Sequence, residues 1–289
     1  MHRRRLLLML FFTALALGQA RGEAQAQVCE RPCVGPQRGA IVAAGGGHLG
    51  ADIYEHFVEL AGGPDAHIVI IPTAGAQEGS HDAWTAIEEL KKAGVRRFEI
   101  LHTRSRGVAE MDAFVAPLFE ATGVWISGGR QWRLIDVYLR TRTHRELEAV
   151  LARGGVIGGN SAGASALASF LIRGAVEDNR TVMAPGREEG FGFLRGVAID
   201  QHILARGREN DLLDVLAARP DLLGIGLNEG TALFITGDLA EVMGESMVAI
   251  YDTTDPLHLI PLRWLRPGEI YDLGARRVLL SVEGRGPGG

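Results

Sequence analysis

Short apolar runs alternate with longer amphipathic segments over the first 160 residues of the chain. The apolar runs predict β-strands at residues 40–44, 68–71, 97–101, 124–127 and 155–158. The segments between them carry apolar residues at helical spacing and predict helices at residues 51–60, 81–93, 111–121 and 132–151. Because the apolar runs do not alternate with polar positions, the strands should be buried on both faces. The pattern predicts an α/β fold with a doubly wound, mostly parallel sheet.

The second half of the chain is less regular. Residues 177–196 are polar and rich in turn formers, which predicts an irregular connection. A strand, a helix and a strand are predicted next, at residues 197–200, 209–218 and 224–227. Turn signals divide residues 231–280, which we expect to form antiparallel strands that complete the same sheet. Without a repeat or linker, residues 40–283 are predicted to form one domain and residues 284–289 a disordered tail.

The N-terminus has the features of a secretory signal peptide, predicted here at residues 1–26. A basic start precedes an almost wholly apolar run at residues 6–17, and Ala24-Gln25-Ala26 offers a cleavage site. The apolar run is shorter than the roughly 20 residues of a membrane span, although an uncleaved anchor is the alternative. Residues 27–39 would then form an N-terminal arm. We expect a secreted or periplasmic protein without membrane contact once the leader is removed.

The balance of charged residues limits the kind of molecule that the protein is expected to bind. The chain has 30 basic and 35 acidic residues, and the leader accounts for four of the arginines and one glutamate. The mature chain is therefore acidic, with a net charge of about −8, which argues against a nucleic-acid partner.

The two cysteines, Cys29 and Cys33, lie in the predicted arm. In an oxidising compartment they could form a local disulfide. No second pair of cysteines or histidines accompanies them, so a metal site is not expected.

The chemistry most visible in the sequence is at Gly159-Asn160-Ser161-Ala162-Gly163. A buried strand ends here in a serine between small residues, and a helical segment follows. This G-x-S-x-G pattern predicts a nucleophile elbow, a sharp turn between strand and helix that exposes one hydroxyl. A glycine-rich turn without chemistry is the alternative. If Ser161 is a nucleophile, it requires a base and an acid that orients the base.

His202 and Glu229 are the candidates for those two roles. Each follows a short predicted strand, and the carboxyl ends of such strands meet at the edge where ligands bind. His2 lies in the predicted leader, and His56, His81 and His144 fall on or beside charged helices, where an exposed surface histidine is expected. The chain order Ser161, His202, Glu229 differs from that of α/β hydrolases, but geometry and not order defines a triad.

Residues 45–50 match the dinucleotide fingerprint G-x-G-x-x-G after the first strand. That fingerprint also requires an acidic residue about 20 positions later, at the end of the second strand. The second strand ends instead in Pro72-Thr73-Ala74. A nicotinamide-dependent oxidoreductase is therefore the weaker hypothesis, and the glycines more naturally permit a tight turn close to the active-site edge.

Four ordered blocks of sequence resemble the cyanophycinase-like serine peptidases, a family that also contains α-aspartyl dipeptidase. The blocks are Ser127-Gly128-Gly129-Arg130-Gln131, residues 159–164, residues 200–208 around Asp200-Gln201-His202, and residues 224–232. The likeness runs from about residue 40 to residue 280. It implies a class I glutamine-amidotransferase-like, flavodoxin-like three-layer α/β fold, with serine where the amidotransferases have cysteine.

The resemblance implies roles for individual residues. Ser161 would be the nucleophile, His202 the general base and then acid, and Glu229 the group that orients His202. Gly129 and Ala162 would supply the oxyanion N–H groups. The positions that match the family's substrate pocket are Gln131, Asp200, Gln201, Arg206 and Arg208.

Cyanophycin is a poly-aspartate backbone whose side chains carry arginine through isopeptide bonds, and the family enzyme releases β-aspartyl-arginine from it. Arginines at 206 and 208 suit substrate carboxylates, and Asp200 suits a cationic guanidinium. This chain departs from the family where Arg130 replaces an aspartate, Asp211 an arginine and Asn228 an aspartate.

We therefore expect an exported serine hydrolase that cleaves cyanophycin through an acyl-enzyme on Ser161, without a metal or organic cofactor. The alternatives are an α- or β-aspartyl dipeptidase or isopeptidase on small peptides, and a non-catalytic binding protein of the same fold. The expected partner is a peptide or polypeptide substrate, and the resemblance also allows a homodimer.

Overall fold

The computed structural model describes three stretches of the chain, residues 33–75, 81–254 and 261–281. The predicted signal peptide and C-terminal tail lie outside these stretches, as do residues 27–32 of the predicted arm. Cys33 is buried and disulfide-bonded, and Cys29, its expected partner, lies outside the described residues. No helix in the described stretches is both long and apolar enough to cross a membrane.

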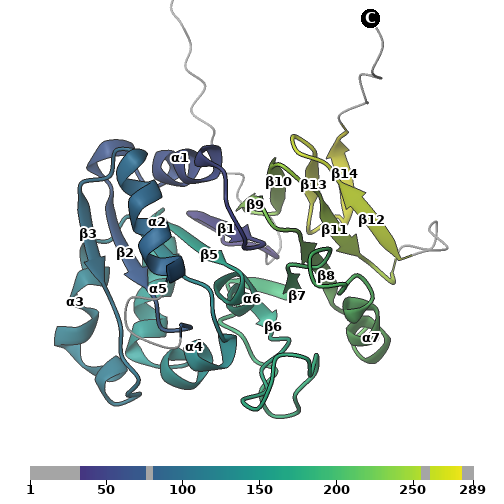
Figure 1. The fold of residues 1–289 in the computed structure, drawn as a ribbon, viewed down its shortest axis with the longest axis horizontal. Coiled ribbons are helices and arrows are strands. Elements are labelled where there is room, and N and C mark those ends of the chain that lie inside the picture. Colours follow the sequence, from purple (N-terminus) through teal and green to yellow (C-terminus); the bar gives the residue numbers. More distant parts are fainter. Residues whose placement is uncertain (1–32, 76–80, 255–260, 282–289) are drawn as a thin grey trace, which may run out of the picture.

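Helices and strands follow one another largely as the hydrophobic pattern predicts (Figure 1). The helices are α1 (Ala51–Leu60), α2 (His81–Lys92), α3 (Asp112–Glu120), α4 (Gln131–Tyr138), α5 (Arg142–Ala152), α6 (Ala162–Leu167) and α7 (Asp211–Ala218). The first nine strands are β1 (Ala40–Ala44), β2 (His67–Ile71), β3 (Arg97–Ile100), β4 (Gly123–Ile126), β5 (Val156–Asn160), β6 (Ala168–Phe170), β7 (Leu194–Gln201), β8 (Leu223–Leu227) and β9 (Thr231–Thr236). The remaining strands are β10 (Leu239–Gly244), β11 (Val248–Tyr251), β12 (Leu262–Leu265), β13 (Ile270–Asp272) and β14 (Arg277–Leu280).

The larger sheet has nine strands in the order β14-β13-β10-β9-β1-β5-β4-β2-β3. Strands β1 to β5 pair in parallel, and β9, β10, β13 and β14 extend the sheet antiparallel from β1. The predicted α/β class, with a parallel sheet and antiparallel C-terminal strands, is confirmed.

Helices cover both faces of the parallel part of this sheet (Figure 1). Successive residues of β1 point to opposite faces, so Ile41 belongs to one buried cluster and Val42 to the other. The cluster that contains Val42 includes side chains from α1 and α2. The cluster that contains Ile41 includes side chains from α3, α4 and α5. Because neither face meets water, both sets of side chains are apolar, which is why these strands read as continuous hydrophobic runs.

The prediction that all C-terminal strands complete one sheet is wrong. Strands β6, β7, β8, β11 and β12 form a second sheet of five strands, in the order β12-β11-β8-β7-β6. Within it β7 pairs in parallel with both β6 and β8, while β11 and β12 are antiparallel. Their hydrophobic pattern resembles that of the first sheet, and only long-range pairing separates the two.

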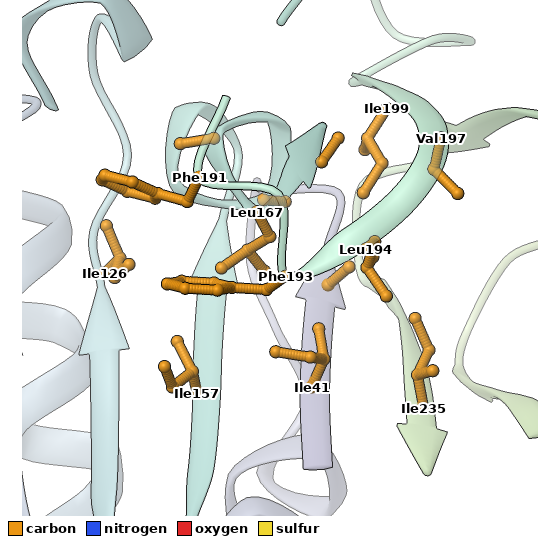
Figure 2. Packing of buried hydrophobic residues seen from close by; sticks show 14 of the residues in the cluster. Ile41, Ile126, Ile157, Leu167, Phe191, Phe193, Leu194, Val197, Ile199 and Ile235 are labelled. Carbon is orange, nitrogen blue, oxygen red and sulfur yellow. The ribbon is translucent and has the colours of Figure 1, made fainter. Parts of the chain in front are cut away.

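One apolar cluster joins the two sheets. Figure 2 shows Ile41, Ile157 and Ile235 of the first sheet in the same cluster as Leu194 and Val197 of β7. All five side chains are completely buried. The sheets therefore share a core, and their relative position is fixed by close packing.

The helix predicted at residues 132–151 is in fact two helices, α4 and α5. The chain leaves helical geometry at residues 139–141, where Arg140 has a left-handed φ of 59°. The Thr141 hydroxyl donates to the carbonyl oxygen of Tyr138 at 2.6 Å. This side-chain bond competes with the helix for a backbone acceptor, which explains a break that the apolar spacing does not reveal.

Strand β3 also departs from the prediction, because it is not buried on both faces. It is the edge strand of the sheet, and Arg97 and Ile100 are exposed. Its sequence, Arg97-Phe98-Glu99-Ile100, alternates charged and apolar residues, unlike the apolar runs of the central strands, and this alternation is typical of a strand that is partly exposed.

Substitution of Phe57 tests how much the packing of helices on this face of the sheet stabilises the fold. Its ring is fully buried and meets the ring of Trp125 edge-on, with 5.1 Å between centroids. Phe57→Ala should lower the free energy of unfolding by about 3–5 kcal/mol, through lost burial and the cavity left behind. Urea denaturation measures the change.

Phe119→Ala is the matched control, because Phe119 is 45% exposed. Its effect on the free energy of unfolding should stay below about 1 kcal/mol. Equal losses in the two variants would contradict the assignment of Phe57 to the core.

Candidate active site

Ser161 stands at the turn between β5 and α6. Its backbone has φ 52° and ψ −116°, a conformation that residues other than glycine rarely adopt. A Cβ added at Gly163 would lie 2.2 Å from the carbonyl oxygen of Ile126, so only glycine lets α6 approach β4 this closely. The strand, turn and helix have the arrangement that the G-x-S-x-G pattern predicts.

The end of β1 organises the site through its backbone. The carbonyl groups of residues 44–46 accept, in chain order, the N–H groups of Ser161 (2.9 Å), His202 (3.2 Å) and Gly230 (3.1 Å). Two of these donors are the triad residues Ser161 and His202 themselves, and the third, Gly230, directly follows Glu229. One short segment therefore fixes the backbone at all three positions.

The side chains of the predicted triad meet. Ser161 Oγ lies 2.8 Å from His202 Nε2, and His202 Nδ1 lies 2.5 Å from Glu229 Oε1. Ser161 and His202 are buried, whereas the Glu229 side chain is 43% exposed. The imidazole thus bridges a hydroxyl and a carboxylate, which is the geometry of a nucleophile, a base and the acid that orients the base.

The glycines that imitate a dinucleotide fingerprint make room for this triad. A Cβ at Gly46 would lie 2.4 Å from the His202 ring, and a Cβ at Gly47 would lie 2.8 Å from the Glu229 side chain. Both glycines also have positive φ angles, of 94° and 68°. The segment therefore packs closely against the imidazole and the carboxylate, which only glycine permits.

Burial lowers the pKa of His202 below its ordinary value of 6.5. The hydrogen bond and charge of Glu229 act in the opposite direction, and the charges of Arg206 and Arg208 add to the lowering. The imidazole is therefore neutral at neutral pH, and its Nε2 can accept a proton from Ser161.

A cavity of about 560 Å³ opens beside Ser161 and His202. Three of the predicted substrate residues, Gln131, Gln201 and Arg206, line it. Arg206 is exposed, whereas the two glutamines are buried with hydrogen bonds to neighbouring residues. The described part of the wall is thus polar, with amide groups and the accessible guanidinium of Arg206.

Asp200 and Arg208 are not in the cavity wall. Asp200 is completely buried and accepts two hydrogen bonds from Arg173, Nε to Oδ1 at 3.2 Å and Nη2 to Oδ2 at 2.9 Å. Arg208 lies 3.6 Å from the same carboxylate and donates to the carbonyl oxygen of Gln201 at 3.2 Å. The guanidinium that Asp200 holds is therefore one of the protein's own.

Arg173 is a residue of the cavity wall that the sequence patterns did not reveal. It lines the cavity, is 2% exposed, and also binds Asp211 and the carbonyl oxygen of Asn179. Its partner Asp200 lies 27 positions away, so no local pattern reveals the pair. The charge of Asp211, a departure from the family pattern, is used in this network.

Arg130, a second departure from the family pattern, holds a neighbouring loop. Its Nη2 donates to the carbonyl oxygens of Ala175 (2.9 Å), Val176 (3.4 Å) and Asp178. The side chain thereby fixes the irregular connection that leads to the cavity wall at Asn179.

The two predicted oxyanion residues lie at the cavity wall and directly after the nucleophile. Gly129 lines the cavity, and Ala162 follows Ser161 as the first residue of α6. Within the described part of the chain, no hydrogen bond occupies the N–H of Gly129 or Ala162. Both groups can donate to an oxygen that develops negative charge near Ser161.

A metal centre has no support in the residues that the structure describes, because they contain no group of three or more histidine, cysteine, aspartate or glutamate side chains placed to bind a metal ion.

Gly46→Ala should disable the site without unfolding the protein. The added methyl group would displace the His202 ring, and a displacement of about 1 Å can cost about 100-fold in rate. Labelling of Ser161 by a fluorophosphonate, followed by mass spectrometry, should slow by at least that factor.

Gly94→Ala is the control for backbone strain. Gly94 has φ +97°, close to the +94° of Gly46, but nothing lies within 4 Å of an added Cβ. Equal labelling rates in the two variants would show that close packing at Gly46 does not position the imidazole.

The pKa of His202 can be measured by NMR titration of its ring, with the signal assigned from its absence in His202→Gln. The midpoint should lie below 6.5, because burial disfavours the charged ring. Glu229→Gln should lower the midpoint further, since Glu229 favours the charged form. A midpoint at or above 6.5 in the wild type would mean that Glu229, and not burial, dominates the pKa of the imidazole.

Curated relatives of this chain are cyanophycinases. The cyanophycinase of Synechococcus elongatus is 32% identical over 271 residues, which cover 83% of this chain and 81% of the relative. The cyanophycinase of Nostoc sp. strain PCC 7120 is 33% identical over 228 residues, which cover 76% and 75% of the two chains.

Solved structures share the fold. A peptidase from an acI-B1 actinobacterium aligns with a TM-score of 0.63 and 23% identity, covering 81% of this chain and 97% of that one. A putative peptidase E protein from Listeria monocytogenes EGD-e aligns with a TM-score of 0.53 and 17% identity, covering 72% and 100%. The sequence model of peptidase family S51 matches residues 41–243. The chain belongs to peptidase family S51 and is a serine-type peptidase.

Proposed function

We propose that this protein is an exported hydrolase that cleaves cyanophycin to β-Asp-Arg dipeptides through an acyl-enzyme on Ser161. The observation that carries the proposal is the continuous contact from the Ser161 hydroxyl through His202 to Glu229. The cyanophycinase relatives at 32% and 33% identity supply the substrate class.

In the acylation step Ser161 Oγ attacks the scissile carbonyl carbon, and its proton passes to His202 Nε2. The imidazolium that forms keeps its hydrogen bond to Glu229, whose negative charge stabilises it. The N–H groups of Gly129 and Ala162 donate to the oxyanion. The imidazolium then protonates the leaving nitrogen, the C–N bond breaks, and the ester on Ser161 remains.

In the deacylation step water takes the place of the leaving amine. His202 Nε2 accepts a proton from the water as it attacks the ester carbonyl, and then returns the proton to Ser161 Oγ. The acid product leaves and the free hydroxyl is restored. No redox step and no external proton source are required.

The cavity supports a substrate with carboxylate and amide groups. Arg206 is the exposed cation in the described part of the wall, and it can bind a carboxylate through two parallel hydrogen bonds. Asp200 is already paired with Arg173, so recognition of a substrate guanidinium would have to use other groups. The proposal therefore places the substrate's carboxylate, and not its arginine head, against a charged partner.

A small aspartyl peptide is the second candidate substrate. The cavity volume of about 560 Å³ is in the range of sites for small ligands, and a dipeptide would fit within it. Such an α- or β-aspartyl dipeptidase would use the same triad and the same chemical steps.

Export rests on the leader predicted at residues 1–26. The mass of the protein recovered from the medium or the periplasm tests it. A protein that retains residues 1–26, or that stays in the cytoplasm, would contradict the export part of the proposal.

The decisive experiment incubates the mature protein with cyanophycin, with β-Asp-Arg and with α-aspartyl dipeptides, and identifies the products by mass. Ser161→Ala should lower the rate by at least about 10³-fold, because no acyl-enzyme can form. Ser165→Ala, the same change one helical turn later, should stay within about threefold of the wild type. Undiminished turnover by Ser161→Ala would refute the mechanism.

A further inference from the structure

Asn160, the last residue of β5, precedes Ser161 and has an unusual environment. Its backbone is fixed in the sheet, where it pairs with Ala44 of β1. Its side chain lines the cavity together with Ser161 and His202. Only 7% of the residue is exposed, so its carboxamide has little contact with solvent.

This carboxamide has no hydrogen-bond partner in the described part of the protein. Oδ1 is buried without a partner. Nδ2 also donates to no described residue, but it is not among the buried unpartnered atoms, and so it keeps access to the cavity. Native proteins leave few buried polar side chains unpaired, and each such case needs an explanation.

Neighbouring amides behave differently. Gln131 Nε2 donates to the carbonyl oxygen of Ile172 at 2.9 Å. Asn228 uses both ends of its amide, accepting from the N–H of Leu204 at 3.3 Å and donating to the Ser246 hydroxyl at 3.2 Å. An amide that served the fold would be paired in this way. The free amide at Asn160 therefore points to a ligand.

We propose that Asn160 is a substrate-binding residue, whose Nδ2 donates a hydrogen bond to a carbonyl or carboxylate oxygen of the substrate next to the scissile bond. This inference rests on the proposed function, since it places the substrate in the cavity beside Ser161. The contact forms in the bound ground state and sets the affinity, whereas the oxyanion is left to Gly129 and Ala162.

Binding can be measured separately from turnover. In the Ser161→Ala protein, calorimetry gives the affinity for a dimer of β-Asp-Arg, a cyanophycin fragment that contains one scissile bond. Adding Asn160→Ala should weaken binding by about 10-fold, the cost of one hydrogen bond to a charged or polar oxygen. Asn160→Asp, which has the same size but places a negative charge where the donor was, should weaken binding more than Asn160→Ala does.

Kinetics and stability complete the test. With Ser161 intact, Asn160→Ala should raise KM by about 10-fold and change kcat by less than about threefold. Its melting temperature should stay at or above that of the wild type, because no hydrogen bond is lost in the free protein. Asn210→Ala, an exposed asparagine outside the cavity, should change neither constant.

The outcomes separate the two proposals. Unchanged affinity and KM in Asn160→Ala, with normal hydrolysis by the wild type, would overturn the role of Asn160 alone. A fall in kcat at constant KM would also overturn it, because the contact would then belong to the transition state. A lower melting temperature of Asn160→Ala would show a structural amide. Absence of both binding and hydrolysis would overturn this inference together with the proposed function.

Discussion

The site depends on the way the backbone at the end of β1 accepts three hydrogen bonds from distant parts of the chain. Residues 44–46 bind the N–H groups of Ser161, His202 and Gly230. Side chains at 46 and 47 would collide with the imidazole and the carboxylate, so the segment must be glycine there. Main-chain hydrogen bonds therefore set most of the triad geometry. The positions of main-chain atoms vary less than those of long side chains.

A second constraint is electrostatic. Asp200 is fully buried two residues before His202, and it is neutralised by Arg173 and approached by Arg208. Removing one partner from such a buried pair leaves an uncompensated charge, which costs far more than the pair itself contributes. Arg173 also binds the carbonyl of Asn179, so the same ion pair joins the strand of the base to the wall of the cavity.

Much of this arrangement could be predicted from local patterns, and the exceptions have a common cause. Parallel strands buried on both faces, and the elbow around Ser161, follow from nearby residues alone. His202 and Glu229 were identified because each follows a strand, and the structure brings both to Ser161. The second sheet and the Arg173–Asp200 pair depend on contacts between distant segments, which apolar periodicity does not encode. The helix break was missed because the left-handed φ of Arg140 and the bond from the Thr141 hydroxyl to Tyr138 leave the apolar spacing unchanged.

Ser161 follows β5 in the first sheet, whereas His202 follows β7 in the second, and Glu229 lies in the link from β8 to β9 that joins the two. The proton path therefore crosses the boundary between the two sheets. The bond from the N–H of His202 to the carbonyl oxygen of Gly45 spans this boundary beside the triad, and the shared apolar cluster packs across it. The alignment of the two sheets is thus itself part of the catalytic geometry.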